Sequence, residues 1–228
     1  MTIRVSDNVS AACLRCQMTM PEGKGGLEAV PQTIGRVRRI FDVNADPSDI
    51  ASVLGCDSAL LPLIKRMPGL RLSGAFDPFD SAVRVIVGQQ ISVVGATMVI
   101  GTMADRAGGL SPMAFLSMND DDFPTPAARA GTIRALAEQV LGGEVKFLVG
   151  SDSLRGSLLA IRGIGPWTAD YVSMRAASNP DVFLATDLGV KKRAQKLFGF
   201  DGEVDLRTRA EAWRPYGGYV VVHLSLND

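Results

Sequence analysis

Apolar residues in most of this chain recur three and four positions apart, as they do along one face of an amphipathic α-helix. The pattern starts near Thr33, with Ile34, Val37 and Phe41, and almost no stretch alternates as a β-strand would. It therefore predicts an all-α fold. The predicted helical segments are 33–41, 50–54, 60–67, 79–103, 132–141, 188–197, 207–213 and 219–226, with two more helices around Gly163.

The longest helical stretch, 79–103, is interrupted at Gly88-Gln89-Gln90, because a glycine there breaks the pattern. We expect two helices joined at this point. Their side chains in the core are predicted to be Val83, Ile86, Val87, Val94 and Met98.

The first 32 residues show no sustained period of either kind, and Gly and Pro residues cluster at 21–26. They predict an irregular N-terminal arm.

Cys13 and Cys16 form a single Cys-x-x-Cys pair without a second pair or a nearby histidine, which is weak evidence for zinc. Cys56 is the only other cysteine, so neither a disulfide framework nor a four-cysteine iron–sulfur cluster fits this chain.

The charge balance limits the kinds of partner. Lys plus Arg and Asp plus Glu each number 24, so affinity for nucleic acid must come from local patches such as 36–39 and 191–196. No apolar run approaches the length of about eighteen residues that a membrane span needs. Polar residues throughout 1–20 also leave no signal-peptide pattern. We expect a cytoplasmic protein without a membrane partner.

The most informative stretch is LLAIRGIGPWTADYV at 158–172. An apolar helical run ends at Gly163-Ile164-Gly165, and Pro166 starts the next helix, where its missing N–H would be unpaired anyway. The glycines let the backbone turn tightly and approach a ligand, and the free N–H groups of the second helix can bind an anion. This is a helix-hairpin-helix, and a DNA phosphate fits it.

An apolar run at 182–185 then ends in Thr186-Asp187, just before the helical segment 188–197. Together with VGQQIS at 87–92, FPTP at 123–126, DVFL at 181–184 and WRPY at 213–216, this order resembles the helix-hairpin-helix DNA glycosylases of the 3-methyladenine DNA glycosylase II type. The resemblance covers about Gly35 to Leu224. It implies two helical lobes around an active-site cleft, with the family's N-terminal β domain absent or reduced.

Asp187 has two interpretations. A carboxylate before an apolar helical run is usually an N-cap that accepts backbone hydrogen bonds. In the resembled family, the aspartate at this position is catalytic: it faces the sugar of an extruded nucleotide, stabilises the positive charge that develops as the base leaves, and can steer the attacking water. One side chain can play both parts.

Trp167 and Tyr171 lie four residues apart and so share one helix face. Core packing would explain such a pair, but the resemblance implies walls of a base pocket, whose aromatic faces attract a positively charged alkylated purine. Leu188 and Ser225 match further pocket positions, where relatives carry tyrosine and tryptophan, so a roomier pocket is expected. Trp167 also replaces the lysine with which bifunctional relatives attack the sugar, so we expect no Schiff base.

The resemblance further implies DNA contacts at Gln89, Gln90, Gly163, Ile164, Gly165 and Thr168, with Gln90 as the wedge that fills the gap left by the flipped nucleotide. A polar loop between helices is the alternative for the two glutamines. The backbone carbonyls of Leu159, Ile161 and Ile164 match those with which the family's hairpins hold a monovalent or divalent cation. No cofactor is otherwise required.

Two functions follow. The first is a monofunctional DNA glycosylase of base excision repair, a monomer that flips 3-methyladenine or 7-methylguanine out of duplex DNA and hydrolyses the N-glycosidic bond. The second is a non-catalytic module that only grips DNA; it would need no carboxylate beside aromatic residues. The implied domains are an arm, 1–32, and a glycosylase domain, 33–228, with one lobe at about 77–176 and the other at about 33–70 plus 180–228.

Overall fold

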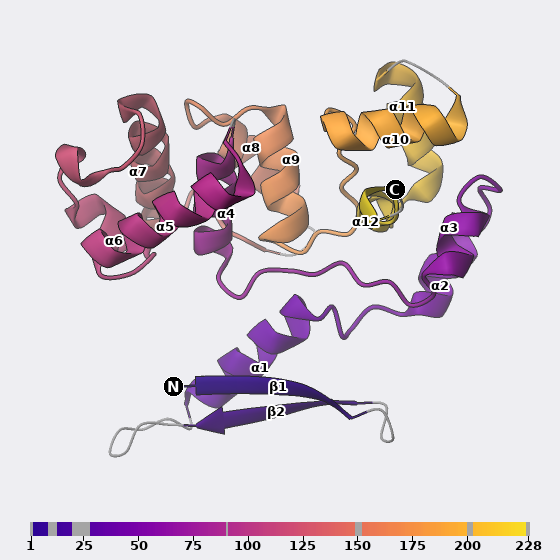
Figure 1. Cartoon of the computed structure of the whole chain (residues 1–228), viewed down its shortest axis with the longest axis horizontal. Helices are drawn as coiled ribbons and strands as arrows, with labels where there is room; N and C mark the ends of the chain where they lie inside the picture. Colours follow the sequence, from indigo (N-terminus) through magenta and orange to yellow (C-terminus); the bar gives the residue numbers. More distant parts are fainter. Residues whose placement is uncertain are drawn as a thin grey trace.

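The computed structural model describes residues 2–8, 13–19, 28–89, 91–148, 152–199 and 203–226, and these form two strands and a series of helices (Figure 1). The strands are β1 (Thr2–Asn8) and β2 (Cys13–Thr19). The helices are α1 (Ala29–Ile40), α2 (Pro47–Leu54), α3 (Leu61–Arg66), α4 (Pro78–Gly88), α5 (Val93–Ala107), α6 (Pro112–Ser117), η2 (Asp120–Asp122), α7 (Ala127–Gly142), α8 (Asp152–Leu159), α9 (Pro166–Arg175), α10 (Leu188–Phe198), α11 (Glu203–Ala210), η3 (Glu211–Trp213) and α12 (Gly217–Leu226). The predicted all-α class is confirmed for the body of the chain.

The N-terminal residues differ from the prediction, because β1 and β2 pair as an antiparallel ribbon instead of an irregular arm. Ile3 pairs with Met18 and Val5 with Cys16, and these four half-buried side chains share one face of the ribbon. The alternation is present in the sequence but weak, because Ile3 and Val5 are the only apolar residues of β1. Cys13 and Cys16 are three positions apart on β2 and so point to opposite faces, which does not suit a shared metal ion.

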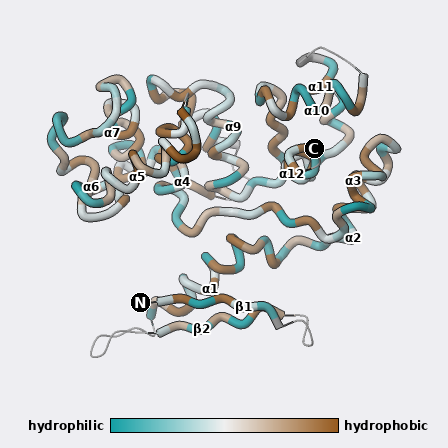
Figure 2. The backbone as a smooth tube through the Cα atoms, viewed as in Figure 1, coloured by the Kyte–Doolittle hydropathy of each residue, from teal (hydrophilic) through white to brown (hydrophobic). Residues whose placement is uncertain are grey.

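Helices α4 to α9 enclose the first hydrophobic core, on the left of Figure 1. Phe115 of α6 is fully buried, and its ring centroid lies 5.9 Å from that of Phe79 and 6.0 Å from that of Phe123. Figure 2 shows the strongly hydrophobic α4 in the middle of this group. Its buried face includes the predicted residues Val83, Ile86 and Val87.

Helix α5 turns a different face to this core from the predicted one. It buries Ile100 and Met103, whereas Val94 and Met98 are 71% and 70% exposed. The reason is that the chain breaks after α4 and restarts at Ser92, whose side chain accepts a hydrogen bond from the Gly95 N–H as the N-cap of α5. The helical period of α4 therefore does not continue into α5.

The second core contains residues from α2, α10, α11 and α12 and lies on the right of Figure 1. Trp213 is fully buried there, and its indole N–H donates to the Asp57 carboxylate at 3.0 Å. Arg209 donates two further hydrogen bonds to that carboxylate, at 2.8 and 2.6 Å. Burial raises the pKa of Asp57, but the hydrogen bonds from Arg209 and Trp213 outweigh it, so the pKa lies below its usual value. This cluster ties α11 and η3 to the turn after α2.

The segment before α4 is fastened to both cores. Arg175, the last residue of α9, donates to the backbone carbonyl of Ser73 at 3.0 Å. Asp42 accepts hydrogen bonds from the Leu72 N–H at 2.9 Å and from the Tyr219 hydroxyl at 2.6 Å. The segment therefore lies against α9, where it forms one wall of the cavity described below. The lobe boundaries proposed from the sequence stay a prediction.

Candidate active site and nucleic-acid interface

The hairpin turn between α8 and α9 depends on Gly163. Its φ is +94°, which side chains other than glycine rarely adopt. A Cβ there would lie 2.2 Å from the hydroxyl oxygen of Thr132, and that hydroxyl donates to the Arg162 carbonyl at 2.9 Å. Helix α7 therefore holds the hairpin turn through Thr132, and only glycine fits at the contact.

The start of α9 is open to a ligand. Gly165 is its exposed N-cap, no side chain caps the helix, and a Cβ at Gly165 would meet nothing within 4 Å. Ile164 is buried and holds the turn between the two glycines. Gly165 and Pro166 are both exposed, so the positive end of the helix dipole lies at the surface. This geometry suits a phosphate.

Gln89 and Thr168 are brought together, although 79 positions separate them in the sequence. The side-chain amide of Gln89 donates to the buried Thr168 hydroxyl at 2.7 Å. The Arg129 guanidinium donates to the backbone carbonyl of Gln89 at 2.9 Å. The turn after α4 is thus fastened to the first turn of α9. Gln90, the predicted wedge, lies outside the described residues.

Asp187 lies half-buried at the N-cap of α10, after the buried residues Leu184 and Ala185. Its Oδ1 accepts from the Val190 N–H at 2.9 Å, so the capping interpretation is confirmed. Its Oδ2 accepts from the Trp167 indole N–H, also at 2.9 Å. Each oxygen of the carboxylate is therefore held by a donor, one from α10 and one from the hairpin helix.

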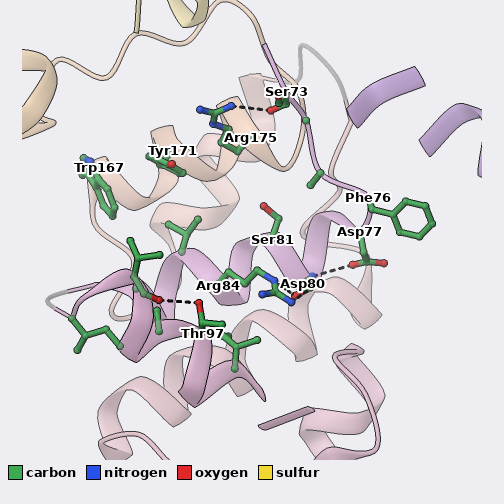
Figure 3. A pocket seen from close by; sticks show the side chains of 18 residues that line it. Ser73, Phe76, Asp77, Asp80, Ser81, Arg84, Thr97, Trp167, Tyr171 and Arg175 are labelled. Carbon is green, nitrogen blue, oxygen red and sulfur yellow. Dashed lines mark hydrogen bonds and ion pairs between the residues drawn. The ribbon is translucent and has the colours of Figure 1, made fainter. Parts of the chain in front are cut away.

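Trp167 and Tyr171 are half-buried, with ring centroids 5.2 Å apart and an angle of 39° between their planes. They line a cavity of about 690 Å³ together with α4, α5 and the segment before α4 (Figure 3). Asp187 is not among the lining residues, and it reaches the cavity wall through Trp167. The aromatic pair and the carboxylate thus form one connected site.

The cavity also contains polar residues that the sequence interpretation missed, namely Asp77, Asp80, Ser81, Arg84 and Arg175. Asp80 is held in an ion pair with Arg84 at 2.7 Å. Arg175 follows Tyr171 by four positions on α9, so the helical period could have indicated it. The residues of α4 carried no such signal, because only the tertiary fold brings α4 opposite α9.

Leu188 and Ser225 are not brought to this cavity. Leu188 is 74% exposed at the first position of α10, where its side chain turns to solvent. Ser225 is exposed near the end of α12, and its hydroxyl donates to the Val221 carbonyl at 2.8 Å. Their assignment to a base pocket is therefore not supported by the cavity that contains Trp167 and Tyr171.

The described residues contain no group of three His, Cys, Asp or Glu side chains placed to hold a metal ion. For the hairpin carbonyls, Ile161 already accepts the Ile164 N–H at 3.0 Å, and a carbonyl oxygen has a second lone pair for an ion. The carbonyls of Leu159, Ile161 and Ile164 thus stay compatible with a cation.

His223 is buried, and burial lowers its pKa, as expected for an interior residue.

Within the described ranges, no helix is both long enough and apolar enough to cross a bilayer.

Comparison with known proteins shows which proteins this chain is similar to. A family model for the AlkA N-terminal domain matches residues 2–77, so the similarity reaches into the β1–β2 ribbon. A solved structure, the DNA-3-methyladenine glycosidase of Bacillus halodurans, superposes with a TM-score of 0.70 at 26% identity, over 77% of this chain and 87% of that one.

Two curated relatives align over most of the chain. One is the probable bifunctional transcriptional activator/DNA repair enzyme AlkA of Mycobacterium tuberculosis, which is 31% identical over 92% of this chain and 45% of the relative. The other is DNA-3-methyladenine glycosylase 2 of Escherichia coli, which is 29% identical over 87% of this chain and 73% of the relative. The chain thus spans less than half the length of the mycobacterial relative.

Proposed function

Because this chain belongs to the helix-hairpin-helix DNA glycosylases of the 3-methyladenine DNA glycosylase II type, we propose that it is a monofunctional glycosylase of base excision repair. It flips an alkylated purine out of duplex DNA and hydrolyses the N-glycosidic bond. The observation that carries this proposal is the Asp187 carboxylate, which a donor from the hairpin helix and a donor from α10 hold in place beside an aromatic cavity.

The chemistry needs little more than this carboxylate. As the bond between C1′ and the base nitrogen breaks, its electron pair leaves with the base and positive charge develops on the sugar. Asp187 stabilises that charge, and its orientation is set before the reaction because Val190 and Trp167 already hold both oxygens. The oxygen of a water molecule then bonds to C1′, and its proton passes to the carboxylate or to solvent.

Alkylated purines suit such a site. A base alkylated at N3 or N7 already carries a positive charge and leaves as a neutral molecule, so no strong general acid is required. The aromatic faces of Trp167 and Tyr171 attract a cationic base by about 0.5–2 kcal/mol beyond burial. Damaged bases also pair and stack less well, so flipping them costs less. These properties support 3-methyladenine and 7-methylguanine as substrates.

The grip on DNA is assigned to the hairpin and the adjoining turn. Gly163, Ile164 and Gly165 bring the open start of α9 to a phosphate, while Gln89, held by Thr168, ties the end of α4 to α9 directly before Gln90 in the sequence. The carbonyls of Leu159, Ile161 and Ile164 would hold a monovalent or divalent cation, whose charge would offset that of the phosphate. The exposed Lys192 and Lys196 of α10 would add to the attraction.

Monofunctional hydrolysis is supported by the residue at position 167. A lyase reaction needs an amine that attacks C1′ and forms a Schiff base, and Trp167 has none. The product is then an intact strand with an abasic site. The rival function, a non-catalytic DNA clamp, needs no carboxylate beside the aromatic pair, so Asp187 would then only cap α10 and tie it to α9.

The experiment is the substitution Asp187→Asn, assayed on duplex DNA treated with a methylating agent. We expect excision to fall by about 10²–10³-fold or more while affinity for DNA stays within twofold, since the carboxylate acts only on a transient charge. An asparagine offers one acceptor to two donors, so a thermal melt must show that the variant is folded. Equal excision by the folded variant would show that Asp187 is only a cap.

A further inference from the structure

The β1–β2 ribbon has an outer edge that can pair with another strand. Among the described residues, β1 and β2 pair only with each other. In Figure 1, β2 lies at the outer margin of the molecule, and β1 lies between β2 and the helices. The far edge of β2 therefore presents backbone N–H and C=O groups to a further strand. A two-stranded ribbon gains from such pairing, because sheets become independently stable only with three or more strands.

Strand β2 lacks the features that usually keep an edge strand from pairing, which are proline, lysine and a β-bulge. It contains neither proline nor lysine, and Arg15 is its only charged residue. Its seven pairs with β1 run in unbroken register, so the ribbon has no bulge. Leu14 is 40% exposed and shares a face with the half-buried Cys16 and Met18. The edge thus offers both backbone groups and apolar side chains.

The sequence of β2 is complementary to itself in an antiparallel pair. A pair centred on Cys16 joins all seven residues of β2 to those of a second copy, around a twofold axis. It places Leu14 opposite Met18 of the second copy, and Arg15 opposite the neutral Gln17. A pair centred on Arg15 would instead bring two arginines together, which is unfavourable. The register centred on Cys16 is therefore the best matched.

The other edge of the ribbon is less suitable. Pairing β1 with its own copy around Val5 would place Ile3 opposite the carboxylate of Asp7, and pairing around Arg4 would oppose two arginines. This edge also lies on the side of the ribbon that faces the helices in Figure 1. A strand from an unrelated protein would require no self-complementarity in β2, so the match of β2 to itself favours a second copy of this chain.

We infer that the protein forms a symmetric dimer in which the β2 strands of two copies pair, so that two ribbons make one four-stranded sheet. This differs from the monomer expected from the sequence. Because β2 lies at the margin of the molecule in Figure 1, the two helical bodies lie on opposite sides of the new sheet. No residue of the ribbon lines the cavity that contains Trp167 and Tyr171, so each copy keeps its own site.

The test is sedimentation equilibrium of the reduced protein, which should dimerise at micromolar concentration. Gln17→Glu places a carboxylate opposite Arg15 of the other copy, on both sides of the twofold axis. It should lower the dimer dissociation constant by about 2–30-fold, since each cross-strand charge pair contributes modestly. Adding Arg15→Glu makes both pairs like-charged and should raise the constant above that of the wild type by a similar factor. Arg15→Glu alone is the matched control, because it faces neutral Gln17, and it should dimerise like the wild type.

Cross-linking checks the register. Directly opposite residues in an antiparallel pair have Cα atoms about 4.5–5.5 Å apart, which is within the range of a disulfide. Diamide takes up two electrons and two protons as two thiols join, so it should link the two Cys16 residues of a dimer. The double variant Cys13→Ser, Cys56→Ser should cross-link like the wild type. Cys16→Ser should not cross-link, although it should still dimerise in sedimentation.

A wild type that stays monomeric would overturn the inference and leave the edge of β2 to a strand from another protein. A dimer that ignores all the charge variants, or that cross-links through Cys13 or Cys56, would also overturn it, because the contact would then lie elsewhere. None of these measurements uses excision, so a failure of the proposed function would be seen separately.

Discussion

The hydrogen bond between Trp167 and Asp187 makes a sharp prediction for Trp167→Phe. Phenylalanine keeps an aromatic ring against Tyr171 but removes the indole N–H that lies 2.9 Å from Asp187 Oδ2. A hydrogen bond to a charged acceptor contributes about 1.5–3 kcal/mol, which corresponds to a factor of about 10–160 in rate. Because both residues are half-buried, we expect the lower part of that range, roughly a 10–50-fold slower excision.

The assay is single-turnover release of 7-methylguanine and 3-methyladenine, with affinity for an abasic-analogue duplex measured on the same samples. The excision rate should fall for both bases by a similar factor, since the sugar cation is common to both, and affinity should change little. Tyr171→Phe is the matched control, because it also keeps a ring and loses one polar atom, but Tyr171 makes no hydrogen bond to Asp187. Wild-type rates in Trp167→Phe would refute the idea that the indole positions the carboxylate.

Three further predictions concern the hairpin, the product and the second core. Gly165→Ala should weaken binding to all DNA sequences alike, because phosphate contacts carry no sequence information. It should not lower the stability, because a Cβ at Gly165 meets nothing within 4 Å. Gly163→Ala should weaken binding in the same way and also lower the melting temperature, because φ of Gly163 is +94° and a Cβ there would lie 2.2 Å from Thr132. Borohydride should trap no covalent adduct with DNA, whereas a trapped adduct would contradict monofunctional hydrolysis. Asp57→Asn should lower the unfolding free energy in urea at pH 7 by about 1–3 kcal/mol. Since the pKa of Asp57 lies below its usual 3.8, this difference is fully present above that value and should disappear as the pH falls through the lowered pKa; a constant difference would refute the assignment.

The hairpin and the capping role of Asp187 could be predicted from the sequence because local chemistry dictates them. Glycines at a turn, a proline at the first helical position and a carboxylate before an apolar run act within a few residues of one another. Most helical segments followed from their period for the same reason, although α6 (Pro112–Ser117) was not predicted. Trp167 and Tyr171 share a face of α9 by spacing alone, and the structure places both on one cavity.

Other features depend on tertiary structure and had no local signal. The face that α5 buries is set by the cap at Ser92, so Val94 and Met98 were wrongly assigned to the core. The contact between Trp167 and Asp187 joins the start of α9 to the start of α10, which a sequence pattern cannot bring together. Leu188 was expected in the pocket on resemblance alone; it is 74% exposed and does not line the cavity that contains Trp167 and Tyr171, so its pocket role stays a prediction.

The β1–β2 ribbon was missed for another reason. Ile3 and Val5 on one strand and Cys16 and Met18 on the other do alternate with polar residues, but Ile3 and Val5 are the only apolar residues of β1. Two apolar positions are too few to establish a period of two. Residues 2–77, which include this ribbon, match the family model for the AlkA N-terminal domain.

The central claim is that this protein releases damaged bases, and one measurement tests it most directly. Duplex DNA carrying radiolabelled methyl groups is incubated with the protein, and the free bases are separated by chromatography. We predict release of 3-methyladenine and 7-methylguanine with intact abasic strands, faster than any release of uracil or 8-oxoguanine from matched duplexes. Tight binding to the same DNA with no free base released would contradict the account and leave a non-catalytic DNA clamp.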